Sequence, residues 1–182
     1  MTSDEAIELL SPAINSRGGV WADLGAGEGT FTRALSELLG PASKIYAVDR
    51  DREALAAIER WAEKSPSKVI PVVGDFSLPF DPPRTALLDG LLFANSLHFV
   101  RDATSVLARL VAWLKPSGRV VLVEYDRVTS NRWVPYPIPA AKLPALTLAA
   151  GLSAPTIIAR HPSIYQGDLY VAVAQRPAPA GA

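Results

Sequence analysis

The sequence predicts a doubly wound α/β fold, in which a mostly parallel sheet is covered by helices on both faces. Short β-rich runs alternate with helical runs along most of the chain, which implies right-handed crossovers between parallel strands. The β-rich runs are apolar without alternation of period two, as expected for strands buried on both faces. The last two β-rich runs have no helix between them and are therefore expected to form an antiparallel pair.

The first expected element is a helix near the N-terminus. Thr2 and Glu5 have the spacing of a capping box, and apolar residues follow at helical intervals to about Asn15. The helix is expected to end before Gly18 and Gly19, because consecutive glycines favour a turn.

Three strands and two helices are expected in the first half of the chain. Leu55, Ile58 and Ala62 share one face of the second of these helices, and Gly40-Pro41 ends the first. The strands are expected at 20–24, 44–48 and 69–73, and the helices at 30–39 and 52–64. This half predicts a βαβαβ unit.

The second half continues the pattern and then changes. Residues 90–94 and 119–124 predict two more strands. A helix over 103–114 joins them, and Pro116 prevents that helix from continuing. A further helix is expected over 140–150, and the terminal strand pair over 155–160 and 169–174. We therefore expect one domain over residues 1–176 and a flexible Pro/Ala tail over 177–182.

The composition excludes several classes of function. The 182 residues contain no Cys, which removes disulfides, thiolate zinc sites and cysteine nucleophiles, and 2 His leave little for a metal site. The 18 basic residues balance 18 acidic ones, so the charge typical of a nucleic-acid-binding protein is missing. No apolar run approaches the length of about 18 residues that spans a bilayer. We expect a cytoplasmic protein with no metal and no membrane segment.

A glycine-rich turn follows the first strand. Gly25, Gly27 and Gly29 alternate with other residues and lead into a helix, so that a ligand can approach the backbone closely. A dinucleotide fingerprint would need its third glycine at Thr30, and the lysine of a phosphate-binding P-loop does not occur. The alternative is that the glycines only form a turn, but their register with Asp23 favours a binding site.

Acidic residues end three successive strands. A carboxylate at Asp23 suits a cation, because it attracts an ammonium 4 Å away by roughly 4 kcal/mol before desolvation. Asp49 has the position that binds ribose hydroxyls, although it can instead cap the next helix in competition with Asp51. Asp75 can accept from an adenine amino group with Phe76 covering the base, or can open a turn. The three acids together predict a cationic amino acid joined to a nucleoside.

At this point the sequence resembles a known family. The segments VWADLGAGEGTFT, IYAVDRD, VVGDFSLPF, DGLLFANSLHFV and LKPSGRVVLVE are similar to the successive motifs of class I S-adenosylmethionine-dependent methyltransferases. The resemblance is close over residues 18–125, and AGLSAPTIIARHPSIYQGDLYVAVAQ resembles the terminal strand pair of that family. It implies a Rossmann-like, seven-stranded sheet of order 3-2-1-4-5-7-6 and S-adenosylmethionine as the cofactor.

The resemblance also implies a role for individual residues. In it, Asp23, the turn at Gly27 and the backbone of Gly25 and Ala26 hold the methionine end of the cofactor, Asp49 holds the ribose, Arg50 covers the adenine face, Asp75 and Phe76 contact the adenine edge, and Asn95 lies near the methionine carboxyl or the sulfonium. Arg50 and Asn95 depend on the resemblance alone, whereas the three acids also follow from the residues themselves.

The acceptor side of the site is less defined. His98 follows the fourth strand, where it can act as a general base toward the acceptor or can simply pack on the next helix. Tyr125 and Asp126 are placed similarly after the fifth strand, but a plain strand end explains them better. Trp133 and Tyr136 either line an acceptor pocket or cover the edge of the sheet.

These observations predict a methyltransferase that transfers a methyl group to an O, N or C atom of a small-molecule acceptor by in-line displacement. The segment Asn95-Ser-Leu-His98 departs from the proline-rich tetrapeptide of relatives that methylate bases or glutamine, so there is no strong case for nucleic acid. The alternatives are a cofactor-binding module or subunit without its own catalysis and a nucleotide-dependent oxidoreductase, which the glycine spacing disfavours. A monomer and a homodimer both remain open.

Overall fold

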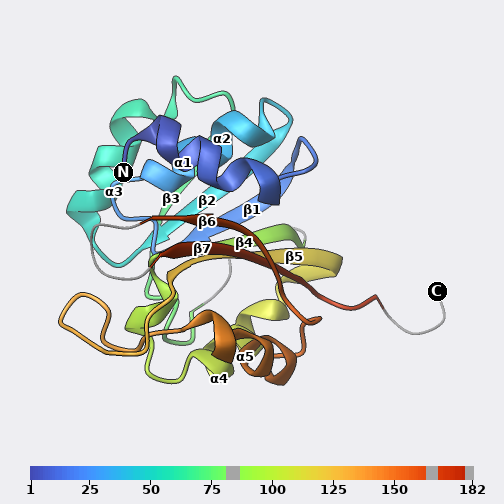
Figure 1. Ribbon diagram of the computed structural model, residues 1–182. Helices are drawn as coiled ribbons and strands as arrows, with labels where there is room; N and C mark the ends of the chain where they lie inside the picture. Colours follow the sequence, from blue (N-terminus) through green and yellow to red (C-terminus); the bar gives the residue numbers. More distant parts are fainter. Residues whose placement is uncertain (81–86, 163–167, 179–182) are drawn as a thin grey trace.

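A computed structural model describes residues 1–80, 87–162 and 168–178, and its described strands form one seven-stranded sheet of order β3-β2-β1-β4-β5-β7-β6 (Figure 1). The strands are β1 (Gly19–Leu24), β2 (Ser43–Asp49), β3 (Lys68–Val73), β4 (Leu88–Ala94), β5 (Leu114–Tyr125), β6 (Thr156–His161) and β7 (Leu169–Gln175). Strands β1 to β5 pair in parallel, and β7 pairs antiparallel with both β5 and β6. The predicted fold class, strand order and antiparallel terminal pair are confirmed.

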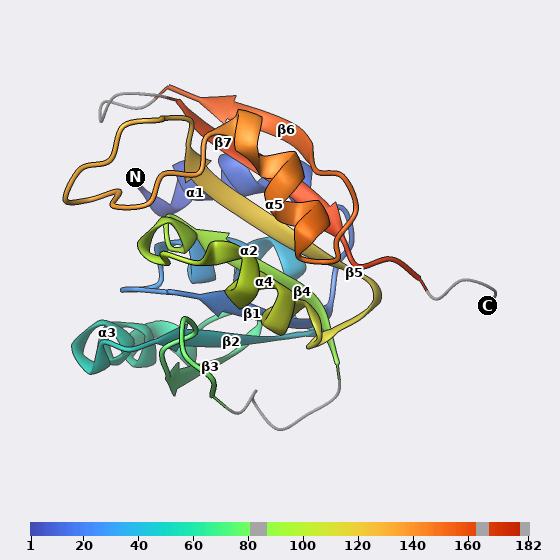
Figure 2. The same ribbon diagram turned by 90° about the horizontal axis from the view of Figure 1, so that it is seen from below.

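Helices cover both faces of the sheet, as Figures 1 and 2 show. The helices are α1 (Ser3–Leu10), α2 (Thr30–Leu39), α3 (Arg52–Ala62), α4 (Ala103–Val111) and α5 (Leu143–Ala149), with 3₁₀ turns η1 (Ser11–Ala13), η2 (Leu97–Phe99) and η3 (Ala140–Lys142). The first three helices pack on one face and the last two on the other. In β5, Val120 and Leu122 belong to one of the two apolar cores, and Val121 and Val123 to the other. This explains why the strand is apolar without alternation.

The local signals predicted the start of the first helix correctly, but α1 ends at Leu10 rather than near Asn15, and the end of the fourth helix was also predicted too late. The capping box is present, since Thr2 Oγ1 accepts from the Glu5 N–H and Glu5 accepts from the Thr2 N–H. The helix expected over 103–114 ends at Val111, and Leu114 already belongs to β5, where it pairs with Leu88. Leu114 is completely buried in the core, so tertiary packing outweighs its helix propensity. Residues 179–182 of the expected tail lie outside the described residues.

The topology brings the carboxyl ends of several parallel strands to one edge of the sheet. Because β1 lies between β2 and β4, the sheet order reverses there, and ligands of open α/β sheets bind at such a point. The turns after β1, β2, β3 and β4 meet at this edge and carry the residues described next.

Candidate functional site

A cavity of about 410 Å³ opens at this edge of the sheet. Most of the predicted cofactor residues line it, namely Gly25, Gly27, Asp49, Arg50, Asp75, Phe76 and Asn95. Other lining residues were not predicted from the sequence, namely Asp51, Gly74, Ser77, Ser96, Phe99 and Val100. Each of these residues lies close in sequence to a predicted residue, and this proximity was the only feature of the sequence that pointed to them. Asp23, Ala26 and His98 are buried and do not belong to the lining.

The glycines of the turn after β1 have separate roles. Gly25 has a φ of +82°, and a Cβ there would lie 2.5 Å from Ser96 Cβ, so the turn packs directly on the segment after β4. Gly27 has a φ of +54°, and a Cβ there would meet no atom within 4 Å. Since Gly27 lines the cavity, the open space beside it is available to a ligand.

Hydrogen bonds already use N–H groups of the turn. The N–H groups of Gly25 and Ala26 both donate to the Val48 carbonyl, at 2.8 and 3.0 Å. The Gly27 N–H donates to Asp49. These N–H groups are therefore not available to a phosphate, which helix N-termini and glycine-rich turns bind through free N–H groups.

Asp23 lies at the end of β1 and is almost completely buried. Its Oδ2 accepts a hydrogen bond from Thr32 Oγ1 at 2.6 Å, whereas Oδ1 has no partner among the described residues. Burial raises the pKa of Asp23 to about 7, with a smaller contribution from the charge of Asp49, and the Thr32 hydrogen bond opposes this shift. A buried carboxylate with one unpartnered oxygen is costly unless a cation or donor completes it.

Asp49 connects β2 to the glycine turn. Its Oδ2 accepts from the Gly27 N–H at 2.7 Å, and its Oδ1 accepts from the Asp51 N–H at 2.9 Å. Asp51 is the residue that caps α3, because its Oδ1 accepts from the N–H groups of Glu53 and Ala54. The cap is therefore not the role of Asp49, which instead places a carboxylate in the cavity wall.

Asp75 both opens a turn and faces the cavity. Its Oδ1 accepts from the N–H and Oγ of Ser77, at 2.9 and 2.6 Å, and its Oδ2 lies 4.0 Å from an Arg50 guanidinium nitrogen. The pair of Arg50 and Asp75 thus joins the turns after β2 and β3. The Phe76 ring is buried edge-on against Phe93, with centroids 5.6 Å apart, and forms part of the cavity wall.

Asn95 is held in an unusual conformation after β4. Its φ is +54°, which is uncommon for a residue other than glycine, and its N–H donates to the Val123 carbonyl at 2.8 Å. Its Oδ1 is buried with no partner among the described residues. Backbone strain and an unpartnered polar atom occur together at ligand sites, so Asn95 is a candidate ligand contact.

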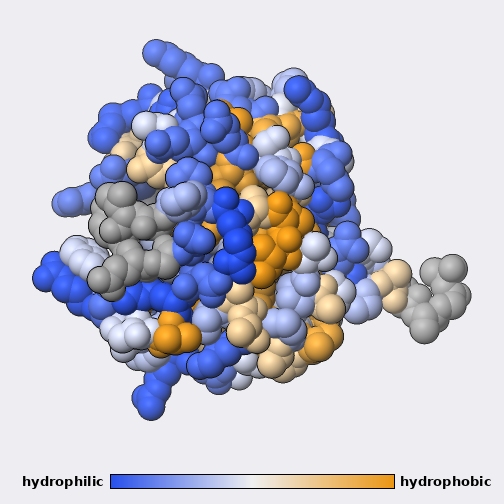
Figure 3. All heavy atoms as spheres, in the orientation of Figure 1, coloured by the Kyte–Doolittle hydropathy of each residue, from blue (hydrophilic) through white to orange (hydrophobic). Residues whose placement is uncertain are grey.

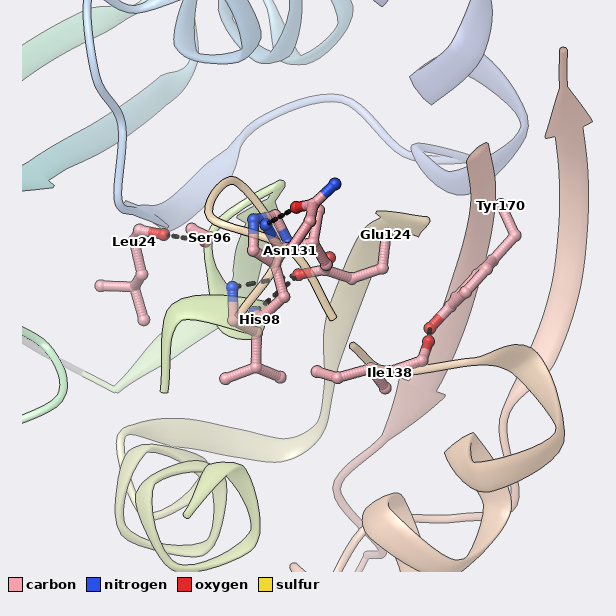
Figure 4. A network of polar contacts seen from close by, with 9 residues as sticks. Leu24, Ser96, His98, Glu124, Asn131, Ile138 and Tyr170 are labelled. Carbon is pink, nitrogen blue, oxygen red and sulfur yellow. Dashed lines mark hydrogen bonds and ion pairs between the residues drawn. The ribbon is translucent and has the colours of Figure 1, made fainter. Parts of the chain in front are cut away.

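His98 is paired with a buried glutamate that the sequence reasoning missed. Its Nδ1 lies 2.5 Å from Glu124 Oε2, and Glu124 Oε1 accepts from the N–H groups of Leu97 and His98 at 3.0 and 3.2 Å (Figure 4). His98 is 2% exposed and Glu124 1%. The ring packs at 4.5 Å from that of Phe99, which lines the cavity. The catalytic role of His98 therefore stays a prediction. An acidic residue at the end of an apolar strand was the available signal for Glu124.

The family model described as "Methyltransferase domain" matches residues 22–120, which is more than half of the chain. The chain belongs to this family. The family and the fold confirm the predicted resemblance to class I S-adenosylmethionine-dependent methyltransferases, with S-adenosylmethionine as the cofactor of the family.

Similar proteins within the family differ in their acceptors. Demethylmenaquinone methyltransferase of Anoxybacillus flavithermus is 33% identical over 59% of this chain, and 12S rRNA N(4)-cytidine methyltransferase of Bos taurus is 35% identical over 41%. The matched regions span 45% and 17% of those proteins. The structure of Burkholderia thailandensis 1,6-didemethyltoxoflavin-N1-methyltransferase is 26% identical with a TM-score of 0.72, covering 96% of this chain and 78% of that one.

Hydrophilic residues predominate on the face of the molecule drawn in Figure 3. Over residues 1–80, 87–162 and 168–178, no three His, Asp or Glu side chains are grouped so that they could hold a metal ion. No helix in these ranges is long and apolar enough to cross a bilayer.

The open space beside Gly27 gives a direct test of the cavity. We expect Gly27→Ala to weaken binding of S-adenosylhomocysteine at least tenfold, because the new methyl group would occupy space at the cavity wall. Gly151→Ala is a matched control, since Gly151 also has a positive φ, of +81°, with no atom within 4 Å of a Cβ. Both variants should lose about 1 to 2 kcal/mol of stability through the left-handed backbone. Equal affinities in calorimetric titration of the two variants would contradict this placement.

Proposed function

We propose that this chain is a methyltransferase that binds S-adenosylmethionine in the cavity and methylates a small-molecule acceptor. The observation that carries the proposal is the pair of buried, unpartnered oxygens, Asp23 Oδ1 and Asn95 Oδ1, beside a turn whose N–H groups are already used. These two oxygens suit an ammonium group. The donor set therefore fits the cationic amino-acid end of the cofactor.

Each remaining part of the cavity has a proposed role toward the cofactor. Asp49 keeps lone pairs for the ribose hydroxyls after accepting from two N–H groups, since a carboxylate has about four acceptor positions. Arg50, Asp75 and Phe76 form the part of the wall that would hold the adenine ring. S-adenosylmethionine supplies a methyl group that its sulfonium activates. The protein contributes mainly by positioning the reactants and excluding water.

The pair of His98 and Glu124 is the candidate for moving the acceptor proton. Because an ionised carboxylate only accepts hydrogen bonds, Glu124 fixes the proton on His98 Nδ1 and leaves Nε2 as the basic ring nitrogen. We propose that Nε2 takes the proton from the acceptor atom. The ring is buried behind the cavity lining, so this role requires the neighbouring Phe99 ring to move when the acceptor binds.

The balance of charge favours a small molecule over a nucleic acid as the acceptor. The chain has no net charge, and the segment after β4 lacks the proline-rich sequence of base methyltransferases. Two similar proteins are a demethylmenaquinone methyltransferase and a 1,6-didemethyltoxoflavin-N1-methyltransferase, and neither name refers to a nucleic acid. Transfer of label to rRNA rather than to small molecules would contradict this choice.

Two measurements test the proposal. Calorimetric titration should show binding of S-adenosylmethionine and S-adenosylhomocysteine and none of NAD, whereas binding of NAD alone would support an oxidoreductase. Transfer of a tritiated methyl group into fractions of a cell extract should then label a small molecule. Cofactor binding without any labelled product would instead support a binding module without its own catalysis.

Asp49→Ala should weaken S-adenosylmethionine binding by about 1 to 3 kcal/mol, because charge-assisted hydrogen bonds to the ribose would be lost. Asp102→Ala is a suitable control, since Asp102 is a carboxylate that accepts from the Ser105 N–H at the start of α4, outside the cavity. An unchanged dissociation constant in a folded Asp49→Ala protein would remove Asp49 from the site.

A further inference from the structure

The segment after β5 forms a loop, residues 126–139, that Asp126 closes at its base. Asp126 Oδ1 accepts from the Ala140 N–H at 2.9 Å, and Asp126 Oδ2 lies 2.7 Å from an Arg160 nitrogen. Within the loop, Asn131 Oδ1 accepts from the N–H groups of Trp133 and Val134, at 2.9 and 2.7 Å. The 126–139 loop is therefore held in a defined conformation.

This loop is attached to the segment that forms one wall of the cavity. The Tyr136 N–H donates to the His98 carbonyl at 3.0 Å, and His98 directly precedes Phe99 in the lining. On the other side, Tyr170 Oη donates to the Ile138 carbonyl at 2.8 Å (Figure 4). Figure 2 shows the loop beside the turn between β4 and α4. The loop is thus hydrogen-bonded to the segment that carries Phe99 of the cavity lining.

Three large rings on these two segments are exposed. Trp133 is 64% exposed, Phe99 52% and Tyr136 42%. Val134, Ile138 and Pro139 are the buried residues of the loop, so the exposed rings are not needed to cover the sheet. Exposed aromatic rings provide flat apolar contact surfaces for a ligand ring.

The loop also carries unneutralised positive charge. Its one carboxylate, Asp126, is paired with Arg160, whereas Arg127 and Arg132 form no ion pair among the described residues. The Arg132 guanidinium lies 4.3 Å above the Trp133 ring and is held there by a cation–π contact. A negative substituent on the ligand would be attracted to this arginine.

We infer that the acceptor is a planar aromatic molecule with an anionic substituent, bound between Phe99 and the 126–139 loop with Trp133 and Tyr136 against its ring and Arg132 near its charge. This inference rests on the proposed function, because it assigns the acceptor of the same cavity. The sequence alone left open whether Trp133 and Tyr136 line a pocket or cover the sheet, and their exposure beside the lining supports the pocket.

The test uses naphthalene-2-carboxylate as the probe, titrated calorimetrically into the full chain saturated with S-adenosylhomocysteine. We expect binding that weakens at least tenfold in Trp133→Ala and in Tyr136→Ala, both of which leave the backbone hydrogen bonds in place. Val128→Ala, in the same loop, and Leu148→Ala, on α5, also remove exposed apolar side chains and should leave binding unchanged. Absence of probe binding, or equal losses in the controls, would overturn the inference.

Two related probes test ring shape and charge separately. Decahydronaphthalene-2-carboxylate, which is not planar, should bind at least tenfold more weakly, and so should 2-naphthylmethylamine, which is cationic. Arg132→Gln should abolish the preference for the acid over the amine without changing the effect of ring saturation. Equal binding of the planar and saturated acids would contradict the aromatic site. S-adenosylhomocysteine binding is measured first, so its failure would count against the proposed function and not against the acceptor class.

Discussion

Asp23→Asn is expected to stabilise the ligand-free protein at pH 8 and to weaken S-adenosylmethionine binding about a hundredfold. The stabilisation follows because burial raises the pKa of Asp23 to about 7, so its ionised form is unfavourable in the folded state. The weakened binding follows because the uncharged amide cannot attract an ammonium group as a carboxylate does. A hundredfold loss corresponds to about 2.7 kcal/mol, less than the roughly 4 kcal/mol available before desolvation.

The pH dependence of stability has a definite sign. The folded pKa of Asp23, about 7, lies above its ordinary value of 3.8, so the folded state binds this proton more tightly than the unfolded state. Its stabilising contribution is complete below pH 3.8 and is lost as the pH rises through 7. Thermal denaturation should therefore show Asp23→Asn more stable than the parent by about 1 to 3 kcal/mol at pH 8, with the difference vanishing near pH 4.

The pH dependence of binding is opposite, because a bound cation favours the ionised carboxylate. In the parent, affinity for S-adenosylmethionine should fall up to tenfold per pH unit below pH 7, while Asp23→Asn should show no such fall. Asp89→Asn is a control, since Asp89 accepts from Val20 and Lys115 away from the cavity and its loss should only destabilise. Equal affinity of Asp23→Asn and the parent at pH 8 would refute the role of Asp23 in binding a cation.

Sequence patterns predicted the fold and the cavity because both depend on local features that repeat along the chain. Strand ends carry Asp23, Asp49 and Asp75, and the parallel order of the strands brings their turns to one edge without any knowledge of side-chain packing. The start of β5 could not be predicted this way. Leu114 joins the sheet because it is buried and pairs with Leu88, a residue distant from it in the sequence.

The pairing of His98 with Glu124 was equally hidden from the sequence. His98 follows β4 and Glu124 lies within β5, and only the neighbouring positions of β4 and β5 in the sheet bring their side chains together. The end of the strand at Tyr125 was visible in the sequence, whereas Glu124, whose carboxylate pairs with His98 Nδ1, lies one position earlier and is buried. Successive side chains of a strand point to opposite faces of the sheet, so a shift of one residue in register decides whether a side chain points to the site or away from it.

Glu124→Ala should therefore be among the most damaging substitutions in the chain. It would leave His98 Nδ1 and the N–H groups of Leu97 and His98 buried without their acceptor, at a cost of about 3 to 5 kcal/mol. Glu124→Gln keeps an oxygen for the two N–H groups and should cost less. Urea denaturation of both variants measures the difference, and equal stabilities of Glu124→Ala and the parent would show that the buried contacts contribute nothing.

A separate substitution distinguishes catalysis from support of the turn after β4. In His98→Asn, the side-chain amide nitrogen can take the place of Nδ1 as the donor to Glu124. The asparagine side chain has no counterpart of the basic Nε2. If His98 takes the acceptor proton, His98→Asn should bind S-adenosylhomocysteine normally and lose methyl transfer by about a hundredfold or more, as removal of a general base does. Normal methyl transfer by His98→Asn would mean that His98 only holds the turn that carries Asn95 and Phe99.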